Sequence, residues 1–104
     1  METIVYSVYT TFTDSTLADA WLRWLRGGHI AEVLAGGALD AEIVELDTPG
    51  PERAFSVRYH FKSRETFAAY ERDHAPRLRA EGLALFPVEK GVTYRRSVGV
   101  VVET

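Results

Sequence analysis

The chain has 104 residues, a length typical of one domain, and we predict a single α+β domain over residues 1–104. Its composition, 46% hydrophobic and 26% charged, is that of an ordinary globular protein. The net charge of −3 gives no basic surplus to hold a phosphate backbone, which disfavours nucleic acid as a partner.

Missing residue types and missing segments exclude further classes of protein. The absence of cysteine excludes disulfide scaffolds, thiol catalysis and iron–sulfur clusters. No apolar run approaches the ~20 residues of a membrane-spanning helix. Residues 1–9 lack the basic start and the unbroken apolar stretch of a signal peptide. We therefore expect a cytoplasmic protein that has no membrane partner.

The first half of the chain predicts a strand followed by an interrupted helix. Residues 3–12 are rich in β-branched and aromatic side chains on both faces, which suits a central strand. Asp14 is a good N-cap for the following helix. The apolar residues of that helix recur with a helical period: Leu17, Ala20, Trp21, Trp24 and Leu25. Gly27 and Gly28 interrupt this period, so we predict two collinear or kinked helical pieces with His29 at the joint.

The second half predicts three more strands around a second helix. Residues 39–47 form one strand, and a turn rich in proline and glycine leads into the strand of residues 53–62. That strand has the sharpest alternation in the chain, because Phe55, Val57, Tyr59 and Phe61 all fall on one face. Residues 92–102 form the last strand.

The second helix has recognisable start and stop signals. Ser63 is its N-cap, and one of its faces collects Phe67, Tyr70, His74 and Leu78. Pro76 removes a backbone N–H and predicts a kink near His74. Gly82 and Pro87 are expected to close the helical region.

The order of these elements, β-α-β-β-α-β, predicts a ferredoxin-like fold. Its economical form is a four-stranded antiparallel sheet with the helices on one face. The other face still carries valine and tyrosine side chains, which are usually covered by a partner. We expect two copies of the chain to meet through this face and form a homodimeric α/β barrel.

Two stretches of the sequence resemble the dimeric α/β-barrel superfamily. Residues 21–34 are similar to its pattern of a tryptophan followed some residues later by His-Ile, here His29-Ile30. Residues 70–82 are similar to a second signature of one uncharacterised bacterial family there, a domain of unknown function of similar length. Residues 55–59 and 94–96 resemble its strand positions. The resemblance covers nearly the whole chain and implies the ferredoxin-like fold, but that family has no established activity.

Relatives in this superfamily suggest several activities. They include antibiotic-biosynthesis monooxygenases, heme-degrading enzymes, muconolactone isomerases and stress-responsive proteins. The heme-degrading pattern places an Asn/Trp/His set near heme, and this chain contains no asparagine. We therefore expect no cofactor.

The three histidines are the candidate acid–base groups, because their ordinary pKa lies near neutrality. His29 is a candidate base at the mouth of a pocket between helices and sheet, and His74 a candidate wall residue paired with it across the helices. The alternative is that both only bond backbone carbonyls at helix breaks. His60 shares a strand face with Arg58, which suits anion recognition inside the barrel or a polar rim of the dimer interface. The spacing of the histidines predicts no metal site.

Aromatic residues of the two helices and the 53–62 strand supply candidate walls for a ligand pocket. The predicted ligand-binding residues are Trp21, Trp24, His29, Tyr59, Tyr70 and His74. The alternative is that the aromatic residues only fill the core. A small apolar or aromatic ligand, bound without demonstrated catalysis, is the favoured function.

Two other functions stay open. One is a cofactor-independent monooxygenase or isomerase, in which His29 or His74 removes a proton and Arg58, Tyr59 or Trp24 stabilises the resulting anion. The other is an interaction module that pairs with a different protein through the exposed sheet.

Overall fold

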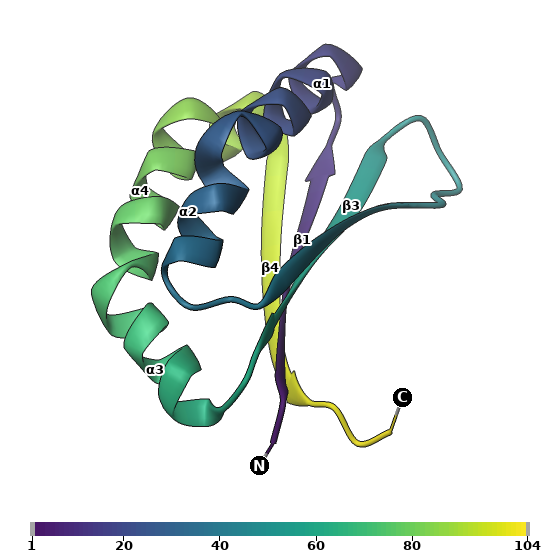
Figure 1. Cartoon of the computed structure of the whole chain (residues 1–104). Helices are drawn as coiled ribbons and strands as arrows, with labels where there is room; N and C mark the ends of the chain where they lie inside the picture. Colours follow the sequence, from purple (N-terminus) through teal and green to yellow (C-terminus); the bar gives the residue numbers. More distant parts are fainter. Residues whose placement is uncertain (1, 104) are drawn as a thin grey trace.

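One antiparallel sheet with helices on a single face makes up the structure, a computed structural model that describes residues 2–103 (Figure 1). The strands are β1 (Ile4–Phe12), β2 (Asp40–Leu46), β3 (Arg53–Phe61) and β4 (Val92–Val100), in the order β2-β3-β1-β4. The predicted ferredoxin-like fold and the central position of the first strand are confirmed. The last strand ends two residues before its predicted end.

Both predicted helices are broken, as their sequences indicate. The first comprises α1 (Ser15–Trp24), a π-helical turn (Leu25–His29) and α2 (Ile30–Ala35). The second comprises α3 (Arg64–Asp73) and α4 (Ala75–Leu85), followed by a short 3₁₀ turn (Val88–Lys90). None of the helices in residues 2–103 is long and apolar enough to cross a lipid bilayer.

Capping and proline chemistry explain where the helices begin. The Asp14 carboxylate accepts hydrogen bonds from the backbone N–H groups of Thr16 at 2.9 Å and Leu17 at 3.4 Å. The Ser63 hydroxyl accepts one from the Thr66 N–H at 3.1 Å. Pro76 lies in the first turn of α4, where its missing N–H leaves no helical bond unmade. Each of these start signals was predicted from the sequence.

The prediction that Gly82 ends the second helix is wrong. Gly82 lies inside α4, and a Cβ atom at this position would stand 3.2 Å from the Trp24 ring. A glycine is therefore suited to this position because it lets α4 approach Trp24 closely, rather than because it terminates the helix.

The hydrophobic core lies between the sheet and the helices. β1 pairs with β3 in a register that places Tyr6 opposite Tyr59 and Val8 opposite Val57. The sheet side chains buried against the helices are Ile4, Tyr6, Phe12, Phe55, Val57, Tyr59, Phe61 and Val92. Full burial of one such side chain stabilises a fold by ~1.5–3 kcal/mol, so this layer sets how firmly the helices are held on the sheet.

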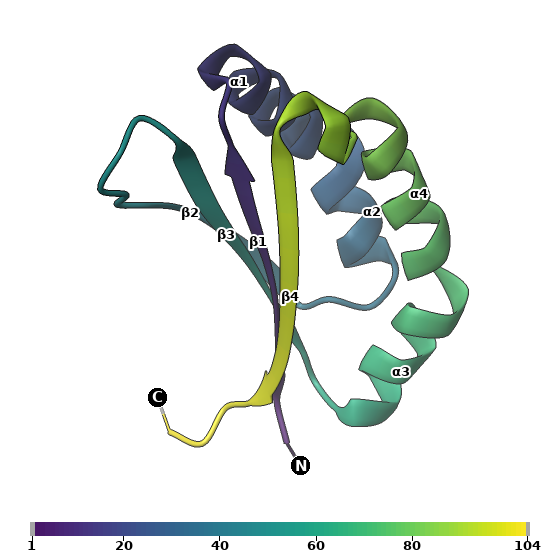
Figure 2. The ribbon, with the colours of Figure 1, turned by 180° about the vertical axis from the view of Figure 1, so that it is seen from behind.

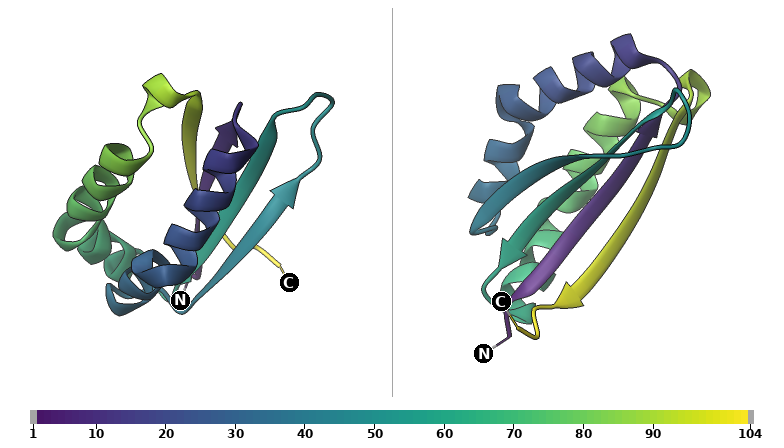
Figure 3. Two further views of the ribbon diagram at one scale, coloured as in Figure 1. Left: turned by 90° about the horizontal axis from the view of Figure 1, so that it is seen from above. Right: turned by 90° about the vertical axis from the view of Figure 1, so that its right-hand side faces the viewer.

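The opposite side of the sheet carries no helix within the described residues, and we call it the open sheet face (Figures 2 and 3). In the right-hand view of Figure 3 the strands lie in front of the green helices α3 and α4. This face is formed by Val5, Ser7, Tyr9 and Thr11 of β1, Asp40, Glu42, Val44 and Leu46 of β2, Ala54, Ser56, Arg58 and His60 of β3, and Thr93, Arg95, Ser97 and Gly99 of β4. It therefore carries a few apolar side chains, Val5, Tyr9, Val44 and Leu46, among serine, threonine and charged residues.

Candidate functional site

A cavity of about 130 Å³ lies between the helical layer and the sheet. It is lined by Tyr6, Val8 and Thr10 of β1, Trp21 and Trp24 of α1, Leu25 and His29 of the π-helical turn, Val33 of α2, Val57 and Tyr59 of β3, Tyr70 of α3, Leu78, Arg79, Gly82 and Leu83 of α4, and Tyr94 and Arg96 of β4. Two of these side chains, Leu83 and Arg96, are exposed, so the cavity reaches the surface between α4 and β4.

The π-helical turn places His29 against Trp24 in the cavity wall. Their rings stack with centroids 4.1 Å apart and planes 24° apart. An i→i+5 hydrogen bond from the Ile30 N–H to the Leu25 carbonyl spans this turn, although the backbone of Gly28 within it is not helical and kinks the chain. Gly28 permits this turn because its φ of 151° is rarely adopted by residues with a Cβ.

Burial holds His29 in its neutral form. Loss of solvent lowers the pKa of the imidazole, and the nearby carboxylates of Glu32 and Glu81 oppose this effect more weakly. Its Nδ1 atom is buried and has no hydrogen-bond partner among the described residues. In a neutral imidazole, an unpaired ring nitrogen either donates or accepts one further hydrogen bond, depending on the tautomer.

Two further lining residues carry unpaired buried atoms. The Thr10 side chain is buried and its Oγ1 has no partner in residues 2–103. The same holds for the Nε of Arg79, while its Nη2 donates to the hydroxyl of Tyr6 at 3.3 Å and to the carboxylate of Glu71. Most buried polar atoms in proteins are hydrogen-bonded. Three such atoms belong to residues that line the same cavity.

Residues 3–101 of the chain match a family model described as Domain of unknown function (DUF4286). The chain belongs to this family. The match confirms the resemblance to an uncharacterised family that the sequence indicated. No curated protein matches the chain.

Solved structures with the same fold share little sequence with this DUF4286 protein. A dimeric ferredoxin-like protein from an uncultured marine organism is 15% identical with a TM-score of 0.74, covering 100% of this chain and 99% of its own. A candidate antibiotic-biosynthesis monooxygenase from Bacillus cereus is 16% identical with a TM-score of 0.68, covering 100% and 97%. SnoaB, a cofactor-independent oxygenase from Streptomyces nogalater, is 9% identical with a TM-score of 0.66, covering 100% and 97%. At these identities the likeness shows the fold alone.

Five of the six predicted ligand-binding residues of the DUF4286 chain line the cavity: Trp21, Trp24, His29, Tyr59 and Tyr70. His74 is not among the described residues that line it. His74 lies at the break between α3 and α4, where its φ is −125°, and its ring stacks on Tyr70 with centroids 6.4 Å apart. A Cβ atom on Gly36 would stand 3.1 Å from the His74 ring, which places this ring beside the end of α2. The structure therefore separates the two candidate bases: His29 lines the cavity, whereas His74 lies outside its lining, beside the end of α2.

Sequence reasoning missed the polar lining residues Thr10, Arg79 and Arg96. A signal for two of them was present, because alternation places Thr10 on the face of Tyr6 and Arg96 on the face of Tyr94. Arg79 follows Leu78 of the apolar helix face, and no spacing rule singles it out. The sequence therefore predicted the aromatic residues of the cavity lining but not the polar residues beside them.

The open sheet face holds the remaining predicted group, His60 with Arg58. The Nδ1 of His60 lies 2.7 Å from an Asp40 carboxylate oxygen, and Arg58 lies 3.6 Å from Glu42. Both residues thus pair across to the edge strand β2. No group of three or more His, Asp or Glu residues in the described part of the chain is arranged to hold a metal ion.

Proposed function

We propose that this DUF4286 protein is a homodimer whose protomers each bind a small, largely apolar molecule in the cavity between helices and sheet. The cavity itself carries the proposal. Its volume of about 130 Å³ is close to the roughly 150 Å³ of an apolar protein cavity that accommodates benzene. The ligand is therefore about one aromatic ring in size.

The walls suit such a ring. Trp21, Tyr59 and Val57 are 1–3% exposed and present apolar surface, and Trp24 offers a flat face beside His29. The unpaired atoms of Thr10, His29 and Arg79 supply a few polar contacts that would orient the ligand. This combination of apolar surface with sparse polar groups is typical of small-molecule sites.

The open sheet face supports the homodimer. Val5, Tyr9, Val44 and Leu46 remain half-buried on a face that no helix covers in the described chain. Two solved structures with this fold are described as dimeric, at 15% identity. Two copies that meet through this face would bury these four side chains.

Thermal denaturation with a graded set of compounds tests ligand binding. Phenol, benzyl alcohol, benzamide and benzoate are expected to raise the melting temperature by about 5 °C for at least one compound at ten times its Kd. Palmitate and three-ring aromatics are expected to give no shift, because the cavity holds about one ring.

A filling variant with a matched control identifies the cavity as the site. Val8→Phe adds a ring to the cavity wall and is expected to abolish the ligand-induced shift. Ile43→Phe adds the same ring on the same sheet face outside the lining and is expected to retain the shift. Far-UV circular dichroism checks that both variants fold. Equal shifts in both variants would place the ligand elsewhere.

One observation favours a second function, a cofactor-independent monooxygenase or isomerase. His29 lines the cavity, is kept neutral by burial and carries an unpaired Nδ1, which suits removal of a proton from an activated phenol or from a carbon beside a carbonyl. The cofactor-independent oxygenase among the structures of the same fold is consistent with this chemistry.

Separate substitution of the two candidate bases tests this second function. In a screen of activated phenols, His29→Gln is expected to lower kcat by about 10²-fold or more. His74→Gln is expected to leave kcat unchanged, because His74 is not among the described residues that line the cavity. Equal turnover in both variants and the parent would remove His29 as the base.

A further inference from the structure

We propose that the cavity selects an aromatic carboxylate, with the ring held between the aromatic walls and the carboxylate received by Arg79 and Arg96. This inference rests on the proposed ligand-binding function and adds the charge of the ligand. It is carried by the distribution of charge and of unpaired donors around the cavity.

The lining holds two arginines although the protein as a whole is negative, and one of them, Arg79, is paired with Glu71 outside the lining. Arg79 and Arg96 are the charged residues among the described lining, which includes no aspartate or glutamate, and His29 is held neutral by burial. The whole chain has 15 acidic against 12 basic residues, for a net charge of −3. The unpaired Arg96 therefore gives the cavity mouth a positive charge, which attracts anions.

One donor of Arg79 is unpaired within the described chain. Its Nη2 is occupied by Tyr6 and Glu71, which fix the guanidinium plane in the wall. Its Nε is buried without a partner among the described residues. An N–H of a charged group is costly to leave unpaired in a buried place, and a carboxylate oxygen is the acceptor that satisfies it best.

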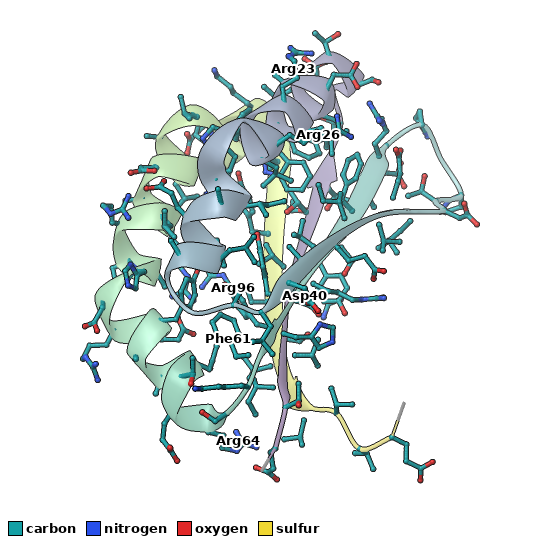
Figure 4. All side chains as sticks on the ribbon, viewed as in Figure 1. Arg23, Arg26, Asp40, Phe61, Arg64 and Arg96 are labelled. Carbon is teal, nitrogen blue, oxygen red and sulfur yellow. The ribbon has the colours of Figure 1, made fainter. Side chains whose placement is uncertain are left out.

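Arg96 stands at the mouth of the same cavity. Its position in β4, opposite Val8, directs it to the helix side of the sheet (Figure 4). No carboxylate in residues 2–103 forms an ion pair with Arg96, whereas Arg53, Arg58, Arg64, Arg72, Arg77 and Arg79 each pair with at least one. The guanidinium of Arg96 therefore remains available to an incoming anion.

Buried tyrosines add neutral donors rather than competing negative charge. Burial raises the pKa of Tyr59 and of Tyr70 well above the ordinary range, so both hydroxyls stay protonated at pH 7. The exposed mouth at Arg96 and Leu83 orients the ligand, since the charged end lies nearest solvent and the ring lies against Trp21 and Trp24. A single ring bearing one carboxylate matches the size, walls and charge together.

Calorimetric titration with benzoate and its neutral isostere benzamide tests the inference. Benzoate is expected to bind at least about tenfold more tightly than benzamide, because a hydrogen bond to a charged group is stronger than one between neutral groups. Arg96→Gln is expected to reduce this preference to about threefold or less, and Arg96→Lys to retain part of it. Arg23→Gln removes an equal charge from the outer side of α1 and is expected to leave the preference unchanged (Figure 4).

The outcomes separate the two proposals. Equal affinity for benzoate and benzamide in the parent protein would overturn the carboxylate preference while leaving the ligand site in place. A preference that persists in Arg96→Gln would remove Arg96 from the anion site. Binding of neither compound, nor of phenol and benzyl alcohol, would overturn the proposed function itself. Melting curves of each variant establish that the protein titrated is folded.

Discussion

The buried imidazole of His29 links the stability of the fold to pH. Its pKa is lowered in the folded protein by burial, while the unfolded chain has an ordinary histidine pKa near 6.5. The unfolded state therefore binds more protons below about pH 6.5, and the folded state loses stability as the pH falls from there through the lowered pKa. Carboxylates with lowered pKa values, such as Glu45 and Asp73, lose their contribution only at lower pH.

We expect the free energy of unfolding to decrease between pH 7.5 and 5.5, by less than about 1.4 kcal/mol per pH unit for this one proton. His29→Gln is expected to flatten this dependence, and His74→Gln to leave it in place. Urea denaturation at a series of pH values measures it. The same slope in parent and His29→Gln would contradict the assignment of the effect to His29.

Two neighbouring threonines of β1 offer a second residue-scale prediction. The hydroxyl of Thr10 is buried without a partner in the described chain, whereas the hydroxyl of Thr11 bonds that of Thr93 on the open sheet face. Thr10→Val removes an unpaired polar group at nearly constant shape and should raise the free energy of unfolding by about 1 kcal/mol. Thr11→Val should lower it slightly, because it removes one partner of a bond. Urea denaturation of both variants decides this, and a lower stability for Thr10→Val would argue against an unpaired hydroxyl.

The element scale shows why the fold was predictable and part of the site was not. Alternation in residues 53–62 identified which strand face meets the helices, because a strand with one buried face must repeat every two residues. The paired glycines before His29 indicated a break, but the i→i+5 turn that stacks His29 on Trp24 depends on backbone bonding that no side-chain pattern specifies. His74 has the same spacing signals as a lining residue, yet the break before Pro76 turns it toward the end of α2.

The two glycines of the π-helical turn make an element-scale prediction with its own control. A Cβ atom at Gly27 would meet nothing within 4 Å, and φ there is not in the left-handed range, so Gly27→Ala should be neutral or stabilise by up to ~1 kcal/mol. Gly28 has φ at 151°, so Gly28→Ala should destabilise by ~1–3 kcal/mol and disturb the stack of His29 on Trp24. Urea denaturation compares the two variants. Equal stability for both would mean that the turn does not depend on the conformation of Gly28.

At the scale of the whole molecule, the account requires the open sheet face to be covered. Val5→Glu replaces one of the apolar side chains of this face by a charge and is expected to shift the protein from dimer to monomer at micromolar concentration. Val88→Glu adds the same charge on the exposed 3₁₀ turn, where Val88 is 55% exposed, and is expected to leave the dimer intact. Sedimentation velocity distinguishes these states. A parent protein that sediments as a well-folded monomer would contradict the dimer, while the cavity within each protomer would stand.

The chain contains two tryptophans, and both line the cavity, so their indole N–H signals report directly on the central claim that this cavity is the ligand site. The measurement is a ¹H–¹⁵N correlation spectrum of the labelled protein during titration with benzyl alcohol and with benzoate. We predict that the signals of Trp21 and Trp24 both move with the Kd obtained by calorimetry. A ligand that binds with measurable heat while both indole signals stay in place would contradict the account.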